Sequence, residues 1–160
     1  MAKPEELLVK ELAARHMTIA AAESCTGGYI AKRLTDVPGA SEVFAGACVT
    51  YTCDAKEKLV GVSHGTLERF GAVSEQTAIE MAEGVRRVLG TDFGVSVTGL
   101  AGPGGGTPEL PVGTVWTAIA GRDGTRTALL RLSPDATREE IRYEAATAVI
   151  RSVLELLTGR

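Results

Sequence analysis

The fold is decided by one stretch of the sequence, Ala20-Ala21-Ala22-Glu23-Ser24-Cys25-Thr26-Gly27-Gly28. Residues 18–22 are apolar and predict a buried strand, and a helical pattern begins directly after the two glycines. A strand, a tight turn and a helix start in direct succession are typical of α/β proteins, which present reactive side chains at such turns. Backbone N–H groups at the start of the helix are free to bind a ligand or a negative charge. Taken alone, the stretch is also compatible with an ordinary turn in which Ser24 or Thr26 caps the helix.

Strand and helix patterns alternate along the rest of the chain. Apolar runs predict further strands at residues 43–52, 93–97, 112–120 and 125–132. Amphipathic spacing predicts helices at residues 5–16, 27–35, 55–60, 75–89 and 137–157. Residues 61–71 are expected to form a connector that holds at most a helical turn at 66–70. Asp54, Ser74 and Thr137 are the expected N-caps, and Asp123-Gly124 predicts a hairpin between the last two strands.

The order of these elements predicts an α/β fold. The early β-α-β-α-β part calls for parallel strands with right-handed crossovers, and the late hairpin adds an antiparallel strand. Helices are expected to cover both faces of this mixed, mostly parallel sheet of about five strands. With 160 residues, the chain is most simply one domain that spans residues 1–160.

The composition of the chain argues against several classes of binding partner. The net charge of −3 gives no general attraction to nucleic acid or to anionic membranes. No apolar stretch is long enough for a membrane span, and the first residues lack a signal-peptide core. Cys25, Cys48 and Cys53 form no CxxC pair, and His16 and His64 lie in no metal-ligand spacing. We therefore expect a cytoplasmic protein without a metal or cofactor. The sequence leaves open whether the protein forms a homo-oligomer.

The first three strands end at positions rich in functional groups, namely Glu23-Ser24, Tyr51-Thr52 and Thr98-Gly99. Carboxyl ends of neighbouring parallel strands meet at one edge of a sheet, which is where such sheets bind ligands. The sequence therefore predicts a site at this edge.

Ser24 and Lys56 are the candidate nucleophile and base at this edge. A serine hydroxyl is a weak nucleophile until a base takes its proton, and neither histidine lies in a recognisable partner motif. Lys56 follows the second strand by one helical turn, where partial burial would lower its pKa enough for it to act as a base. Tyr51 is a candidate proton donor. A solvated surface position for Lys56 is the alternative, since most lysines are exposed.

The turn itself offers an oxyanion hole and a rival nucleophile. Thr26 and the amides of Gly27 and Gly28 are the candidate donors to a developing oxyanion. Cys25 could act as a thiolate at the helix start, although a small buried apolar role is more common for such a cysteine.

A glycine-rich loop follows the third strand, with the sequence Thr98-Gly99-Leu100-Ala101-Gly102-Pro103-Gly104-Gly105-Gly106. It matches neither the dinucleotide fingerprint nor the Walker A spacing. Its amides can nevertheless hold a phosphate or a carboxamide, and a flexible connector is the alternative. The candidate binding residues here are Thr98, Gly99, Ala101, Gly102, Gly104 and Gly105. Arg142, near the start of the last helix, is a candidate cation for an anionic substrate group, with a surface ion pair to Glu139 as the alternative.

Five ordered motifs carry a family resemblance that covers nearly the whole chain. They are Ala22-Glu23-Ser24-Cys25-Thr26-Gly27-Gly28, Val49-Thr50-Tyr51-Thr52-Cys53-Asp54-Ala55-Lys56, Gly71-Ala72-Val73-Ser74-Glu75, Thr98-Gly99-Leu100-Ala101-Gly102-Pro103 and Pro111-Val112-Gly113-Thr114-Val115. Together they closely resemble the C-terminal domain of the competence/damage-inducible protein CinA, which also occurs alone as nicotinamide-mononucleotide amidase. The chain departs from the family pattern at Thr52-Cys53-Asp54, where Ser-Asn-Glu is expected.

The resemblance implies a three-layer αβα sandwich and a function. The implied reaction is hydrolysis of nicotinamide mononucleotide to nicotinic acid mononucleotide and ammonia in pyridine-nucleotide salvage. The family's serine nucleophile falls on Ser24, its lysine on Lys56 and its tyrosine on Tyr51. The N-terminal domain of CinA proteins is not expected in a chain of this length, nor is that domain's chemistry. Two alternatives stay open, a non-catalytic nucleotide- or partner-binding module and a thiol amidase that uses Cys25.

Overall fold

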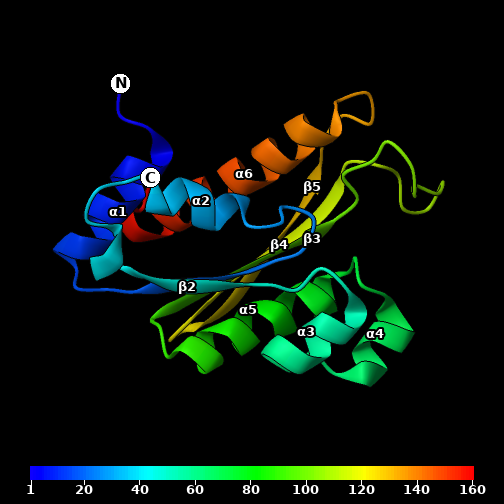
Figure 1. Ribbon diagram of the computed structural model, residues 1–160, viewed down its shortest axis with the longest axis horizontal. Coiled ribbons are helices and arrows are strands. Elements are labelled where there is room, and N and C mark those ends of the chain that lie inside the picture. The colour runs from blue at the N-terminus through cyan, green and yellow to red at the C-terminus, as the bar shows by residue number, and fades with distance from the viewer.

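Five strands form a single sheet in the order β2-β1-β3-β4-β5 (Figure 1). The computed structural model describes residues 1–160. The strands are β1 (Ile19–Glu23), β2 (Phe44–Val49), β3 (Phe93–Gly99), β4 (Thr114–Gly121) and β5 (Gly124–Arg131). The strand β1 pairs in parallel with β2 and β3, whereas β4 is antiparallel to both of its neighbours. Four strands therefore run in one direction, which confirms the mixed, mostly parallel sheet.

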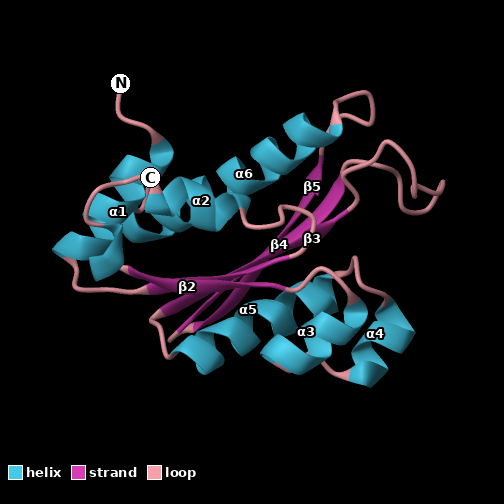
Figure 2. Cartoon of the chain, in the orientation of Figure 1, coloured by secondary structure: helices cyan, strands magenta, loops and turns pink.

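Helices cover both faces of the sheet, as Figure 2 shows. Those on one face are α1 (Pro4–Ala14), α2 (Tyr29–Thr35) and α6 (Arg138–Thr158). Those on the other face are α3 (Cys53–Val60), α4 (His64–Phe70) and α5 (Glu75–Leu89), and a 3-10 turn, η1 (Ala40–Glu42), precedes β2. The predicted three-layer αβα arrangement is confirmed. None of these helices combines the length and the apolar character needed to cross a membrane.

The alanine-rich strand β1 lies between β2 and β3, and its side chains are buried on both faces of the sheet. Ile19 and Ala21 belong to the main apolar core under α1, α2 and α6, whereas Ala20 and Ala22 contact the smaller core under α3, α4 and α5. Successive side chains of a strand point to opposite faces, so one short run serves both cores. Small side chains let both helical layers approach the sheet closely.

Local signals account for most element boundaries, and the differences have physical reasons. The helix α2 begins at Tyr29 instead of residue 27, because Gly27 and Gly28 have φ of 57° and 104°, in the left-handed region outside a helix. The expected cap Asp54 is wrong, because the side chain of Thr52 accepts the Ala55 N–H and α3 begins at Cys53, two residues earlier than expected.

Four further predictions concern the connector, two helix caps and the hairpin. The expected connector at residues 61–71 contains a full short helix, α4. The caps Ser74 and Thr137 are confirmed, as is the hairpin, whose two strands end and begin at Gly121 and Gly124.

Candidate active site

The structure brings Ser24 and Lys56 together. Ser24 directly follows β1, and Lys56 lies in the first half of α3, which follows the neighbouring parallel strand β2. Lys56 Nζ donates hydrogen bonds to Ser24 Oγ at 2.9 Å and to the Thr50 carbonyl at 2.8 Å. The lysine side chain is almost fully enclosed, since its residue is only 1% exposed. The exposed-lysine alternative is therefore wrong, and the expected serine–lysine contact is present.

The environment of Lys56 favours the neutral amine. No carboxylate forms an ion pair with it, and burial is the largest influence that lowers its pKa below the ordinary value of 10.5. The thiols of Cys25 and Cys53 have the opposite influence, because negative charge on them raises the pKa of Lys56. A neutral lysine in contact with a serine hydroxyl can remove the hydroxyl proton, whereas a lysinium cannot.

A buried carboxylate shapes the turn that carries Ser24. Glu23 has no exposed surface, and it accepts hydrogen bonds from Thr26 Oγ1 at 2.7 Å and from the N–H groups of Ile30 at 2.8 Å and Ala31 at 3.0 Å. The helix α2 has a glycine at its N-cap, which offers no side-chain acceptor, so Glu23 satisfies these N-terminal donors instead. The Thr26 hydroxyl is thus used inside the fold, and sequence reasoning assigned Glu23 no role.

A pocket of about 290 Å³ lies beside the serine, at the carboxyl ends of β1 and β3. It is lined by Ser24, Cys25, Tyr51, Lys56, residues 72–73, residues 98–102, Gly104 and Arg138. Among the predicted binding residues, Thr98, Gly99, Ala101, Gly102 and Gly104 therefore lie at the pocket. Larger hollows of about 530 and 610 Å³ share Arg86 and Arg122, but neither is lined by a serine, a cysteine or a lysine.

The glycine-rich loop contributes residues to the pocket lining whose backbone N–H groups have no partner in the chain. The Leu100 N–H is paired with the Thr114 carbonyl, and Thr98 Oγ1 donates to the Ala72 carbonyl at 2.6 Å. By contrast, the N–H groups of Ala101, Gly102 and Gly104 donate to no acceptor within the chain. Paired neighbours hold the loop in place, so these three amides are available to an anionic or carbonyl oxygen of a ligand.

Arg138 is a pocket residue that sequence reasoning missed. It is the first residue of α6, and its guanidinium donates to the Gly102 carbonyl at 2.7 Å and to the Tyr51 hydroxyl at 2.9 Å. Tyr51 is 56% exposed and contacts this arginine instead of Ser24 or Lys56. A cation in the first turn of a helix is electrostatically unfavourable, because the positive end of the helix dipole lies there. An arginine at the predicted start of the last helix is therefore the feature of the sequence that could have indicated a functional residue.

Five predicted residues lie outside the pocket lining, and the buried Thr26 is one of them. Arg142 donates from Nε to the Cys25 carbonyl at 3.1 Å and from Nη2 to the Thr26 carbonyl at 3.0 Å, so it lies behind the turn. The Gly27 N–H donates to the Ser24 carbonyl and is not free for an oxyanion. Gly28 is the N-cap of α2, and Gly105 follows the part of the loop that lines the pocket.

Cys25 is placed in the pocket wall but is electrostatically unsuited to attack. Its side chain is buried, and burial raises the pKa of the thiol to about 11. A thiol is nucleophilic as the thiolate, which would be scarce at neutral pH with such a pKa. The geometry and the electrostatics therefore favour Ser24.

Comparison with known proteins gives one consistent result. The family model of the CinA C-terminal domain matches residues 1–157. A CinA-like protein of Kosmotoga olearia is 48% identical over 142 residues, which are 89% of this chain and 34% of that protein. A CinA-like protein of Akkermansia muciniphila is 55% identical over 127 residues, 79% of this chain and 31% of that protein. The chain thus spans about a third of the length of these curated relatives.

Solved structures agree with the family match. The crystal structure of a competence/damage inducible protein from Agrobacterium tumefaciens has a TM-score of 0.92 and 40% identity, and the match covers 98% of this chain and 96% of that one. The crystal structure of a CinA superfamily protein from Escherichia coli has a TM-score of 0.91 and 33% identity, and the match covers 96% of this chain and 88% of that one. The chain belongs to the CinA C-terminal domain family.

Proposed function

We propose that this chain is an amidohydrolase that converts nicotinamide mononucleotide to nicotinic acid mononucleotide and ammonia. The observation that carries the proposal is the 2.9 Å hydrogen bond between Lys56 Nζ and Ser24 Oγ, at the wall of an open pocket. A serine held against a buried lysine of lowered pKa is suited to nucleophilic attack on a carboxamide.

The first step of the reaction forms a tetrahedral intermediate on Ser24. Neutral Lys56 removes the proton of Ser24, whose oxygen attacks the carboxamide carbon of the substrate. The positive pyridinium ring withdraws electrons from that carbon and makes it more electrophilic. The free N–H groups of Ala101, Gly102 and Gly104 line the same pocket and are the available backbone donors to the developing oxyanion. They take the place of the Gly27 amide, which is paired within the turn.

Collapse of this intermediate releases ammonia and leaves an ester on Ser24, and hydrolysis of that ester then releases the acid. The departing nitrogen must be protonated, and the lysinium formed in the first step can return its proton to it, as a single base does in other serine hydrolases. Tyr51, held by Arg138, is a second proton donor at the pocket. Water then attacks the ester with Lys56 again as base, which regenerates Ser24 and yields the carboxylate.

The anionic phosphate of this substrate requires a cation at the pocket, and Arg138 is the one present. Its guanidinium lines the pocket, whereas the guanidinium of Arg142 is bonded to the turn behind it. Arg138 is therefore the preferred phosphate partner, together with the loop amides. The proposed substrate is a small nucleotide. The three free cysteines fit the reducing cytoplasm, where we place the protein.

The test is the initial rate of ammonia release from nicotinamide mononucleotide, nicotinamide riboside and nicotinamide. We expect the mononucleotide to be the best substrate, because the riboside lacks the phosphate and should lose on the order of 2–4 kcal/mol of binding. Equal rates on the mononucleotide and the riboside would remove phosphate recognition from the account. If none of the three releases ammonia, the assigned reaction is wrong, and a binding module becomes the better description.

A further inference from the structure

Arg142 holds both carbonyl groups of the turn that follows Ser24. Its Nε and Nη2 atoms donate to the consecutive carbonyls of Cys25 and Thr26 at 3.1 and 3.0 Å. The planar guanidinium presents two parallel donors, a geometry that a lysine ammonium cannot reproduce. The remaining nitrogen, Nη1, lies 3.7 Å from the Glu139 carboxylate. All three nitrogens therefore face groups of this chain, and none is directed to the pocket.

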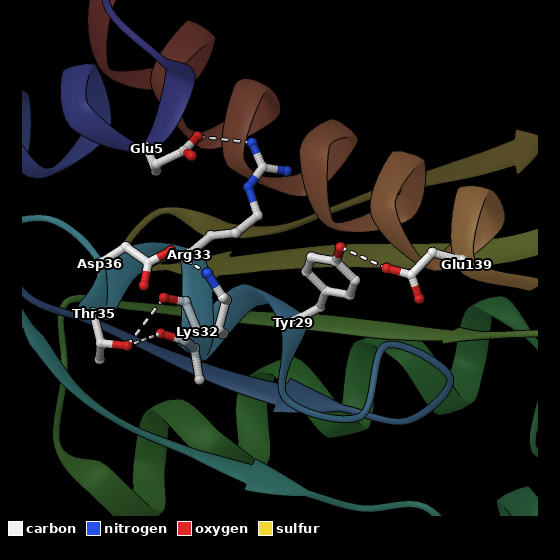
Figure 3. Close-up of polar contacts among 8 residues, drawn as sticks. Glu5, Tyr29, Lys32, Arg33, Thr35, Asp36 and Glu139 are labelled. Carbon is white, nitrogen blue, oxygen red and sulfur yellow. Dashed lines mark hydrogen bonds and ion pairs between the residues drawn. The ribbon is translucent and has the colours of Figure 1, made fainter.

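Tyr29 and Glu139 fix the arginine from the sides. The Tyr29 hydroxyl donates to Glu139 at 2.9 Å, a bond that links the first turns of α2 and α6 in Figure 3. The Arg142 guanidinium lies 5.6 Å from the centre of the Tyr29 ring, within range of a cation–π contact. The Tyr29–Glu139 bond thus joins α2 to α6 beside Arg142.

The position of the Ser24 hydroxyl depends on this turn. Within the turn, the Ser24 carbonyl accepts the Gly27 N–H, and on the sheet side the Ser24 N–H donates to the Val97 carbonyl. Arg142 packs tightly against the turn, since a Cβ added at Gly27 would lie 3.3 Å from its Nη2. A shift of the Cys25 and Thr26 peptides would therefore move Ser24 relative to Lys56.

We propose that Arg142 is a positioning residue that acts through the turn to hold the Ser24 hydroxyl against Lys56. This inference rests on the proposed function, because it concerns the nucleophile of that reaction. It also gives α6 two roles at the site, since Arg138 reaches its pocket side and Arg142, one helical turn later, holds the rear. The last helix thereby completes a site whose nucleophile lies more than a hundred residues earlier, as the 117-residue separation of Arg142 from Cys25 shows.

The test compares Arg142→Met with Arg151→Met, a matched control at an exposed position of the same helix. We measure kcat and KM for ammonia release and the dependence of kcat on pH. Displacement of a reacting group by about 1 Å can reduce a rate about a hundredfold, so we expect kcat of Arg142→Met to fall about tenfold or more. KM should change less than about threefold, because no substrate contact is removed. The control should keep both constants.

The pH profile separates positioning from simple loss of stability. A loosened turn lets water reach Lys56, which reduces the effect of burial, so the midpoint of the profile should move to higher pH in Arg142→Met. Lys56 faces Ser24, the Thr50 carbonyl and the thiols of Cys25 and Cys53, none of which this variant changes. A variant that is only partly folded would lose amplitude and keep the midpoint. If Arg142→Met does not fold, Arg142→Lys replaces it, and we expect a smaller fall in kcat with the same direction of shift.

Two outcomes would overturn the inference. One is an unchanged kcat and midpoint in a folded Arg142 variant. The other is a tenfold rise of KM with unchanged kcat, which would make Arg142 a substrate contact.

The rate at which a fluorophosphonate labels Ser24 gives a second readout. In this reaction the serine oxygen bonds to phosphorus, fluoride leaves, and Lys56 takes the proton. If the parent chain is labelled but releases no ammonia, the assigned substrate fails, while slower labelling of Arg142→Met still supports positioning. A parent chain that shows neither reaction refutes both.

Discussion

At the scale of single residues, the account depends on Lys56 as a base instead of a fixed positive charge. We predict that Lys56→Arg is as damaging as Lys56→Ala, with losses of about a hundredfold or more in the rate of ammonia release. Arginine keeps a positive charge but does not give up its proton in proteins. A Lys56→Arg variant with near-normal activity would reduce the lysine to a positioning charge and exclude the serine–lysine mechanism.

The lowered pKa of Lys56 also fixes the direction of the pH dependence. The active form is the neutral amine, so the rate should rise with pH through the folded-state pKa and level off above it. Burial places the midpoint below 10.5. Initial rates between roughly pH 6 and pH 10, corrected with Ser24→Ala as the blank, measure this profile. A rate that falls over this range would show that the protonated lysine is the active form.

At the scale of elements, the position of α3 controls where Lys56 lies, and a glycine of α5 sets that position. A Cβ at Gly84 would lie 1.9 Å from the carbonyl oxygen of Val60, the last residue of α3. We predict that Gly84→Ala lowers the free energy of unfolding by about 2–4 kcal/mol and reduces activity, because α3 must move. The measurement is urea unfolding, with Gly65→Ala as the control, since the nearest atom there is 3.6 Å away. Equal stability of the two variants would show that α3 does not depend on this close approach.

Elements with strong local signals could be predicted from the sequence, and contacts between distant elements could not. The caps Ser74 and Thr137 and the hairpin at Asp123-Gly124 are local features that act within a few residues. The start of α3 was placed incorrectly, because Thr52 and Asp54 are both good capping residues and only the folded backbone selects one.

In the candidate site, too, some features follow from the local sequence and the strand topology, and others depend on contacts between distant elements. The proximity of Ser24 and Lys56 could be predicted, because parallel topology alone places the ends of β1 and β2 together. The contacts of Arg138 and Arg142 could not, since they depend on how α6 packs more than a hundred residues away from the turn. The burial of Glu23 under three donors likewise depends on the completed start of α2.

At the scale of the whole molecule, the candidate site combines four separate segments of the chain. They are the turn after β1, the helix α3, the loop after β3 and the start of α6. All four meet at the carboxyl edge of the parallel strands, whereas the larger hollows lie where β4 and β5 join and contain no such chemistry. The chain spans about a third of the length of its curated relatives. The amidase activity is proposed for this chain and does not extend to the remaining two thirds of those proteins.

The proposed mechanism requires that Ser24, and not Cys25, attacks the carboxamide. The rate of ammonia release from nicotinamide mononucleotide by the matched variants Ser24→Ala and Cys25→Ala distinguishes the two nucleophiles. We expect a loss of about a hundredfold or more for Ser24→Ala and a change of less than about threefold for Cys25→Ala. Retained activity in Ser24→Ala together with its loss in Cys25→Ala would contradict the claim and assign the chemistry to the thiol.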